Sequence, residues 1–242
     1  MNRILVTLIV LTFATACPSR LDYLKKSPEF THAAIEAGGI AFTPAGCMVS
    51  PKKVSTKDLA ALREDAVILL ARERPKMPVK AAQDTDLALG DDVWNPLMTY
   101  TKTGALPGQD LEDLATRAGV RFLGLFRVET WELGHSTDAI EMPGEDGEKN
   151  KISYRKRSWA TMQLRLTVYD NKDGSLAWLG IEEGFLANDD LGPFVSPDNA
   201  EAVRVAAEAS AKIPYPASPS PAKVGEMIFR KFVEHFPEAK QK

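Results

Sequence analysis

The chain has 242 residues, of which 44% are hydrophobic and 26% charged, and its 30 basic and 33 acidic residues leave a formal charge of −3. This composition excludes a wholly disordered, collagen-like or fibrous protein, and no nucleic-acid partner is expected because no net positive charge is available to neutralise phosphates. Two cysteines are too few for a disulfide scaffold or a four-thiolate zinc site.

Residues 1–16, MNRILVTLIVLTFATA, have the features of a signal peptide. Arg3 precedes an apolar run, and small residues end at Ala16. The run is too short to cross the roughly 30 Å hydrocarbon core of a bilayer, which needs about 20 apolar residues. The sequence therefore predicts export, with removal of this segment, rather than a membrane-spanning helix.

Cys17 follows directly, and the sequence ATAC at 14–17 resembles a bacterial lipobox, in which the cysteine is acylated and becomes the first residue. Ala14 stands where the lipobox usually has Leu. Ordinary signal-peptidase cleavage is the alternative, and Cys17 would then be able to pair with Cys47 in an oxidising compartment. We favour acylation of Cys17. Because Pro18 rather than Asp follows, the resemblance implies an outer-membrane anchor that faces the periplasm, with a soluble periplasmic or secreted protein as the alternative.

The remaining chain is predicted to fold as an α+β domain with a single mixed sheet and helices packed on it. Residues 17–37 are assigned to a lipidated N-terminal tether, 38–212 to the α+β domain, 213–221 to a proline-rich connector and 222–242 to a C-terminal amphipathic helix. Strands are expected near 39–43, 77–80, 120–131, 158–169 and 175–186. Helices are expected over 55–74, 92–101, 110–118, 198–212 and 222–236.

Two of these predictions rest on strong local signals. Ser55 is a good N-cap and Asp58, three residues later, is placed for the reciprocal hydrogen bond of a capping box. Residues Trp159–Tyr169 alternate between apolar and polar side chains, and the turn sequence NKDG at 171–174 follows them. A long helix after Ser55 and a β-hairpin around the NKDG turn are therefore expected.

A cluster of aromatic and basic residues is the candidate recognition site. It lies beside Gly134–Lys151, a polar segment that we interpret as a hairpin excursion offering an adaptable contact. Arginine and aromatic side chains favour binding to an anionic glycan, a lipid headgroup or an acidic protein surface. The alternative is that the charges only protect a strand end against edge pairing. The candidate partner-binding residues are Trp131, Tyr154, Arg155, Arg157 and Trp159.

No motif for catalysis, metal or cofactor binding is found. The three histidines, His32, His135 and His235, form no HxxxH or HxH pair, and neither a G-x-S-x-G elbow nor a glycine-rich phosphate loop is present. Glu182 and Glu183 are adjacent on a predicted strand, so their side chains point to opposite faces and do not form a dyad. We assign no catalytic residue, no metal and no cofactor.

The order of elements resembles a known bacterial lipoprotein domain. A helix ending in glycine leads into a strand in LATRAGVRFLGLFRV, and a later strand, SWATMQLRLTVYD, ends in a hairpin marked by Asp170, Gly174 and Trp178. This pattern, over about residues 38–187, is similar to the domain shared by the curli-secretion lipoprotein CsgG, the peptidoglycan-synthase activator LpoB and the TolB amino-terminal domain. The resemblance implies an envelope-assembly or regulatory binding module without catalysis.

The leading hypothesis is therefore a non-catalytic lipoprotein that faces the periplasm and binds an envelope protein or a peptidoglycan-associated component, with the membrane contacted through N-terminal acyl chains. One alternative is an envelope hydrolase that acts on glycan or lipid through a dispersed acid pair. A further alternative is an oligomeric channel or secretion-complex subunit, in which case the chain forms a homo-oligomer.

Overall fold

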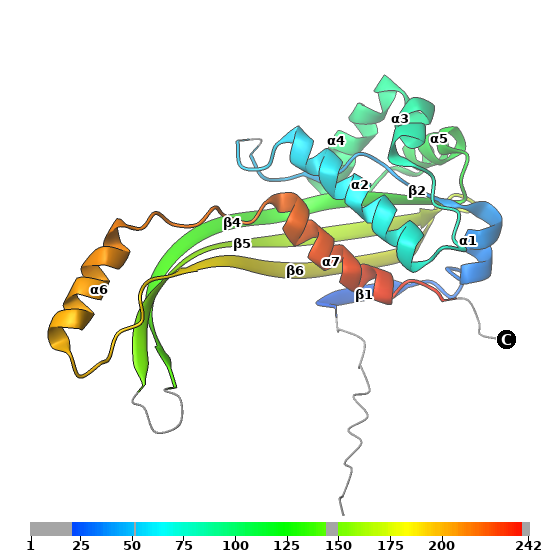
Figure 1. Ribbon diagram of the computed structural model, residues 1–242. Helices are drawn as coiled ribbons and strands as arrows, with labels where there is room; N and C mark the ends of the chain where they lie inside the picture. The colour runs from blue at the N-terminus through cyan, green and yellow to red at the C-terminus, as the bar shows by residue number, and fades with distance from the viewer. Residues whose placement is uncertain (1–20, 51, 144–149, 239–242) are drawn as a thin grey trace, which may run out of the picture.

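The computed structural model describes residues 21–50, 52–143 and 150–238 (Figure 1). The predicted signal peptide and Cys17 lie outside these residues. Within them, one mixed sheet runs in the order β1-β6-β5-β4-β2, and β3 also pairs with β4. The strands are β1 (Tyr23–Lys26), β2 (Ile40–Phe42), β3 (Gly46–Cys47), β4 (Phe122–Met142), β5 (Lys151–Asp170) and β6 (Ser175–Leu191). The predicted α+β class is confirmed.

Helices pack on both faces of one end of this sheet, whereas α6 (Ala200–Lys212) lies beside the other end (Figure 1). The helices are α1 (His32–Gly38), α2 (Thr56–Glu73), α3 (Ala82–Leu89), the short 3₁₀ helix η1 (Asp91–Val93), α4 (Trp94–Thr103), α5 (Gly108–Ala118), α6 and α7 (Pro221–Glu234). The predicted capping box at the start of α2 is present, with both reciprocal hydrogen bonds between Ser55 and Asp58. Local sequence therefore determined where this helix begins.

The part of the molecule that carries helices on both faces of the sheet is here called the body. One core lies under α2 and α7, where the ring of Phe126 stacks on Phe42 at 5.2 Å and meets Phe229 edge-on at 5.6 Å. A second core lies on the opposite face under α4 and α5, and contains Leu123 and Leu125. Since successive residues of a strand point to opposite faces, β4 supplies apolar side chains to both cores.

Strands β4, β5 and β6 continue beyond the body into a curved extension, here called the arm (Figure 1). The arm comprises α6 and residues 132–142 of β4, 151–161 of β5 and 184–191 of β6. The predicted strand limits at 131, 158 and 186 are therefore wrong, because β4, β5 and β6 all extend beyond them. The interpretation of 134–151 as an excursion is also wrong, since residues 134–142 belong to β4. These strand extensions contain many polar residues, so a hydrophobic pattern does not reveal them. They are stabilised instead by strand pairing and by α6 and the connector, which cover one face.

Two other segments differ from the sequence prediction. The strand expected at 77–80 is reduced to a bridge between Val79 and Ile40, because Pro78 has no N–H to donate. Residues 21–37, predicted as part of the tether, contribute β1 and nearly all of α1, and the ring of Phe30 is buried against Phe122 at 5.2 Å. The pairing of β1 with β6 joins segments about 150 residues apart, which no local pattern reveals.

Candidate binding surface

One face of the arm is covered by the chain itself. Lys156, only 7% exposed, donates to the carbonyls of Ala211 and Ile213, and its ammonium lies 4.8 Å from the ring centre of Tyr215. Ser158 Oγ donates to the Pro216 carbonyl. These contacts hold α6 and the connector that follows it on the outer side of the curve (Figure 1).

The opposite face of the arm is here called the open face. Residues directly across an antiparallel pair share a face, so the register of the three strands defines its members. They are Glu132, Gly134, Ser136 and Asp138 of β4, Arg155, Arg157, Trp159 and Thr161 of β5, and Phe185, Ala187, Asp189 and Leu191 of β6. Phe185 and Leu191 are each 50% exposed, so this face presents two large apolar side chains to the solvent.

Trp159 lies at the middle of the open face. Its indole stacks on Phe185 with the ring centres 6.3 Å apart and the planes inclined at 29°. A Cβ atom on Gly134, the residue opposite on β4, would lie 2.1 Å from Cζ2 of this indole. The absence of a side chain at position 134 therefore lets the indole lie flat across the sheet. Ala187, on the other side of Trp159, is also small.

Two arginines on β5, on the side of Trp159 away from Phe185, pair with carboxylates. Arg157 donates twice to Asp189, at 2.7 and 2.8 Å, which raises the pKa of Arg157 and lowers the pKa of Asp189. Arg155 lies within 3.5 Å of Asp138 and 3.7 Å of Asp189. The arginines are thereby held by carboxylates, and the charges on this face are balanced rather than strongly positive.

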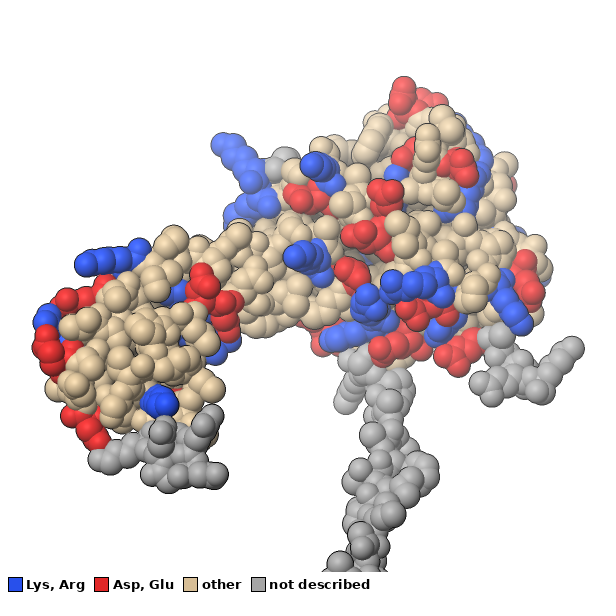
Figure 2. All heavy atoms as spheres, viewed as in Figure 1, with Lys and Arg blue, Asp and Glu red and all other residues tan. Residues whose placement is uncertain are grey.

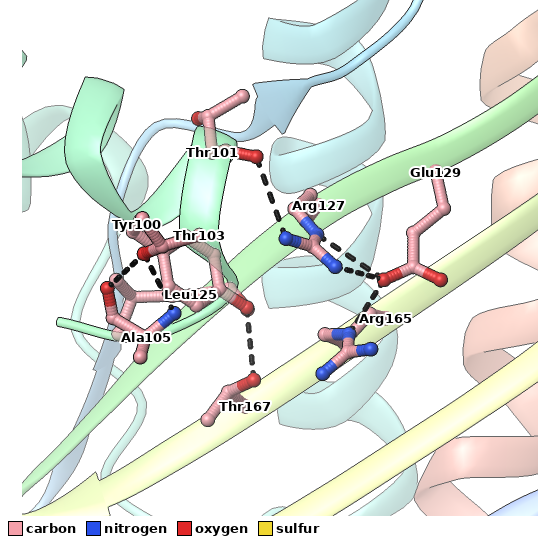
Figure 3. Close-up of polar contacts among 9 residues, drawn as sticks. All are labelled: Tyr100, Thr101, Thr103, Ala105, Leu125, Arg127, Glu129, Arg165 and Thr167. Atoms are coloured by element: carbon pink, nitrogen blue, oxygen red, sulfur yellow. Dashed lines mark hydrogen bonds and ion pairs between the residues drawn. The ribbon is translucent and has the colours of Figure 1, made fainter.

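A polar network lies in the body, close to the point where the arm begins (Figure 3). Glu129 occupies a β-bulge in β4 and accepts hydrogen bonds from Arg127 and from Arg165, the latter at 2.6 Å. Burial alone would raise the pKa of Glu129, but these hydrogen bonds outweigh it and lower the pKa below its ordinary value. Arg127 also donates to the Thr101 carbonyl, which connects α4 to the bulge.

A buried tyrosine strengthens the same junction. Tyr100, fully buried, shares a 2.8 Å hydrogen bond with the hydroxyl of Thr167 and donates to the Leu125 carbonyl (Figure 3). Burial raises the pKa of Tyr100, so the phenol stays neutral. Glu129 and Tyr100 therefore have a structural role, at the point where helices stop covering the face of the sheet that α4 packs on.

The structure divides the five predicted partner-binding residues. Arg155, Arg157 and Trp159 alternate along β5 and lie together on the open face. Tyr154 lies on the covered face, because neighbouring residues of a strand alternate. Trp131 is 3% exposed and belongs to the core under α7. The bulge at Glu129 shifts the alternation of β4 by one residue and so turns the Trp131 indole inward.

Sequence reasoning missed the residues that complete the open face on the neighbouring strands. Phe185, Asp189 and Gly134 are about 25 to 30 residues away from Trp159 along the chain and meet it only through strand pairing. The hairpin around the NKDG turn was the one available signal, since a hairpin register places β6 residues opposite β5 residues.

The remaining candidate chemistry is limited. Among the described residues, no group of three or more His, Cys, Asp or Glu side chains is arranged to hold a metal ion. None of the described helices is long and apolar enough to cross a bilayer. Cys47 is partly buried, its thiol lies 3.6 Å from the Val49 carbonyl, and burial raises the pKa of this thiol. Acidic and basic side chains are interspersed over the face visible in Figure 2.

Comparison with known proteins gives matches only among solved structures, since no family model and no curated protein matches. PelC of Paraburkholderia phytofirmans, a dodecamer, is 11% identical with a TM-score of 0.37, over 90% of this chain and 97% of that chain. The lipoprotein GNA1162 of Neisseria meningitidis is 13% identical, with a TM-score of 0.34, over 71% and 92%. The C-terminal domain of LpoB of Salmonella enterica is 10% identical, with a TM-score of 0.28, over 63% and 96%. The neighbours thus include lipoproteins at low identity, and TM-scores this low support no functional inference.

Proposed function

We propose that this protein is a non-catalytic lipoprotein of the bacterial envelope that binds a partner protein through the open face of its arm. The observation that carries the proposal is the preorganised stack of the half-exposed Phe185 on the partly buried Trp159, next to arginines that are already paired with carboxylates. Aromatic and arginine side chains dominate the energetics of protein interfaces, most of all where they are rigid before binding.

The charge balance of the open face favours a protein over an anionic lipid or glycan as the partner. Arg157 has both of its donated hydrogen bonds on Asp189, and Arg155 lies near two carboxylates. A phosphate or an anionic headgroup would meet the carboxylates of Asp138 and Asp189 beside these arginines, and like charges brought together are unfavourable. This face matches a protein surface better than an anionic lipid or glycan. An apolar side chain of the partner would contact the aromatic pair, and polar groups around it would contact the ion pairs.

Anchoring through Cys17 completes the proposal, although this residue lies outside the described part of the chain. Acylation of Cys17 would hold the protein on the periplasmic side of the outer membrane. Replacing Cys17 with Ala is expected to move the protein from the membrane fraction to the soluble periplasmic fraction. Unchanged fractionation would contradict the lipid anchor and leave the binding surface to be tested separately.

The binding test uses a photo-crosslinking amino acid in intact cells. Placed at Leu191 on the open face, it is expected to give one discrete crosslinked protein, and the matched probe at the exposed residue Glu112 of α5 is expected to give none. Trp159→Ala should remove the crosslink. A crosslink that is equal at both positions, or that joins only wall glycan, would contradict a protein partner at this face.

A homo-oligomer is a second candidate, favoured by the edges of the arm. Among the described residues, the outer edge of β4 beyond Val128 and that of β6 beyond Ile181 have no strand partner. Two free edges on opposite sides of one ribbon are able to pair between copies. Light scattering after size exclusion tests this: a monomer at all concentrations would exclude it, and Thr137→Pro on the β4 edge should dissociate an oligomer.

A further inference from the structure

A groove on the body, remote from the open face, is the feature that the proposed function does not use. It lies between α2 and the junction of α3, η1 and α4, with Pro44 and Ala45 at its base, and encloses about 490 Å³. That volume falls in the range of small-molecule sites, which are mostly apolar with a few placed polar groups. Its apolar lining includes Leu59, Ala60 and Val93.

An ion pair bridges the groove from α2 to α3. Both terminal nitrogens of Arg63 donate to the Asp86 carboxylate, at 2.5 and 2.6 Å. The Arg63 side chain is only 8% exposed, whereas that of Asp86 is 47% exposed. Of the other N–H groups of Arg63, that of Nε is enclosed and has no hydrogen-bond partner. The charge of Arg63 is balanced by Asp86, whose oxygens keep lone pairs that face the solvent.

The charges that line the groove therefore favour a cation. Asp86 and Asp91 both contribute to the lining, against the single and already paired Arg63. An anionic ligand would meet two carboxylates, against one arginine whose charge Asp86 already balances. An ammonium group would meet carboxylate acceptors in a partly enclosed site, where charge-assisted hydrogen bonds are strong.

The rim of the groove adds an exposed aromatic ring. Trp94 is 55% exposed and Leu87 is 78% exposed, and both line the groove. Asp91 and Trp94 are three residues apart on consecutive helical turns, so they lie on the same side of the η1–α4 segment. Tryptophan is the aromatic side chain that binds cations best through its ring face.

We infer that this groove binds a small organic cation, an ammonium group carried on an apolar body. The ammonium is held by Asp86, Asp91 and the ring of Trp94, and the apolar body lies against Leu59, Ala60 and Val93. The site does not depend on the function proposed for the arm, because it contains none of the residues of the open face.

Calorimetric titration of the purified full chain with 2-phenylethylamine tests the inference. Two isosteric probes, 3-phenylpropanoate and 2-phenylethanol, carry a negative charge and no charge. The amine is expected to bind at least about tenfold more tightly than the carboxylate, the ratio that corresponds to one favourable charge contact. Equal affinity for the amine and the carboxylate, or no binding of the amine, would overturn the inference.

Variants at exposed positions locate the binding. Trp94→Ala and Asp91→Asn are each expected to weaken amine binding at least about fivefold, because each removes one contact to the ammonium. Trp159→Ala, on the open face, is the matched control and should leave amine binding unchanged. Amine binding that survives both groove variants, or that is lost in the control, would overturn the assignment. Circular dichroism of each variant verifies the fold.

Discussion

The body and the arm are built from the same three strands but differ in how these are covered. In the body, helices pack on both faces of the sheet, and Phe126 is fully buried. In the arm, α6 and the connector cover one face only, and Phe185 on the other is half exposed. The difference shows that one antiparallel ribbon can be buried on both faces in one half and leave one face to the solvent in the other.

The largest expected effect is on the body. Phe126→Ala should lower the free energy of unfolding by about 3–5 kcal/mol, because it leaves a cavity between Phe42 and Phe229 in a fully buried core. Urea unfolding measures this loss. If it were below about 1 kcal/mol, the body would not be the tightly packed half of the molecule.

The next effect concerns the cover of the arm. Lys156→Met removes the ammonium that binds the carbonyls of Ala211 and Ile213, and we expect a local cost of about 2–3 kcal/mol. Hydrogen exchange should become faster in residues 200–217 and remain unchanged in α2. The exposed Lys212→Met is the control. Faster exchange throughout the body would mean that arm and body unfold as one unit.

A smaller effect is expected at the junction, and it depends on pH. The pKa of Glu129 is lower in the folded protein than in an unfolded chain, so its contribution to stability is complete above about pH 5 and is lost as the pH falls through the folded pKa. Glu129→Gln should cost about 1–2 kcal/mol at pH 7 and less at pH 3. Urea unfolding at both pH values, with Glu112→Gln as control, measures this. A cost that grows on acidification would contradict the assigned direction.

The smallest effect on stability is expected on the open face. Phe185→Ser should change the free energy of unfolding by less than about 0.5 kcal/mol, because the side chain is already half in water. The same substitution should weaken the crosslink formed from position 191. A large loss of stability with an unchanged crosslink would show that Phe185 is structural and would remove it from the binding surface.

The candidate site shows how much strand periodicity alone can predict about which residues share a face. Arg155, Arg157 and Trp159 are spaced by two residues, but the predicted strand began at 158, so their common face became evident only when β5 was found to begin at Lys151. Tyr154 was grouped with them by proximity, against the same alternation. The pattern could not predict that Trp131 is buried, because the bulge at Glu129 that turns its side chain inward depends on pairing with β5.

The sequence by itself determined the elements whose signals are local: the capped helix α2, the β4 strand through its apolar start, and the hairpin of β5 and β6. These features arise from contacts between residues near one another in the chain. Only the tertiary structure decided that the strands continue into an arm, that residues 23–26 join the sheet, and that Phe185 meets Trp159. Those outcomes depend on pairing between distant segments, whose stability comes from burial and register rather than from local preference.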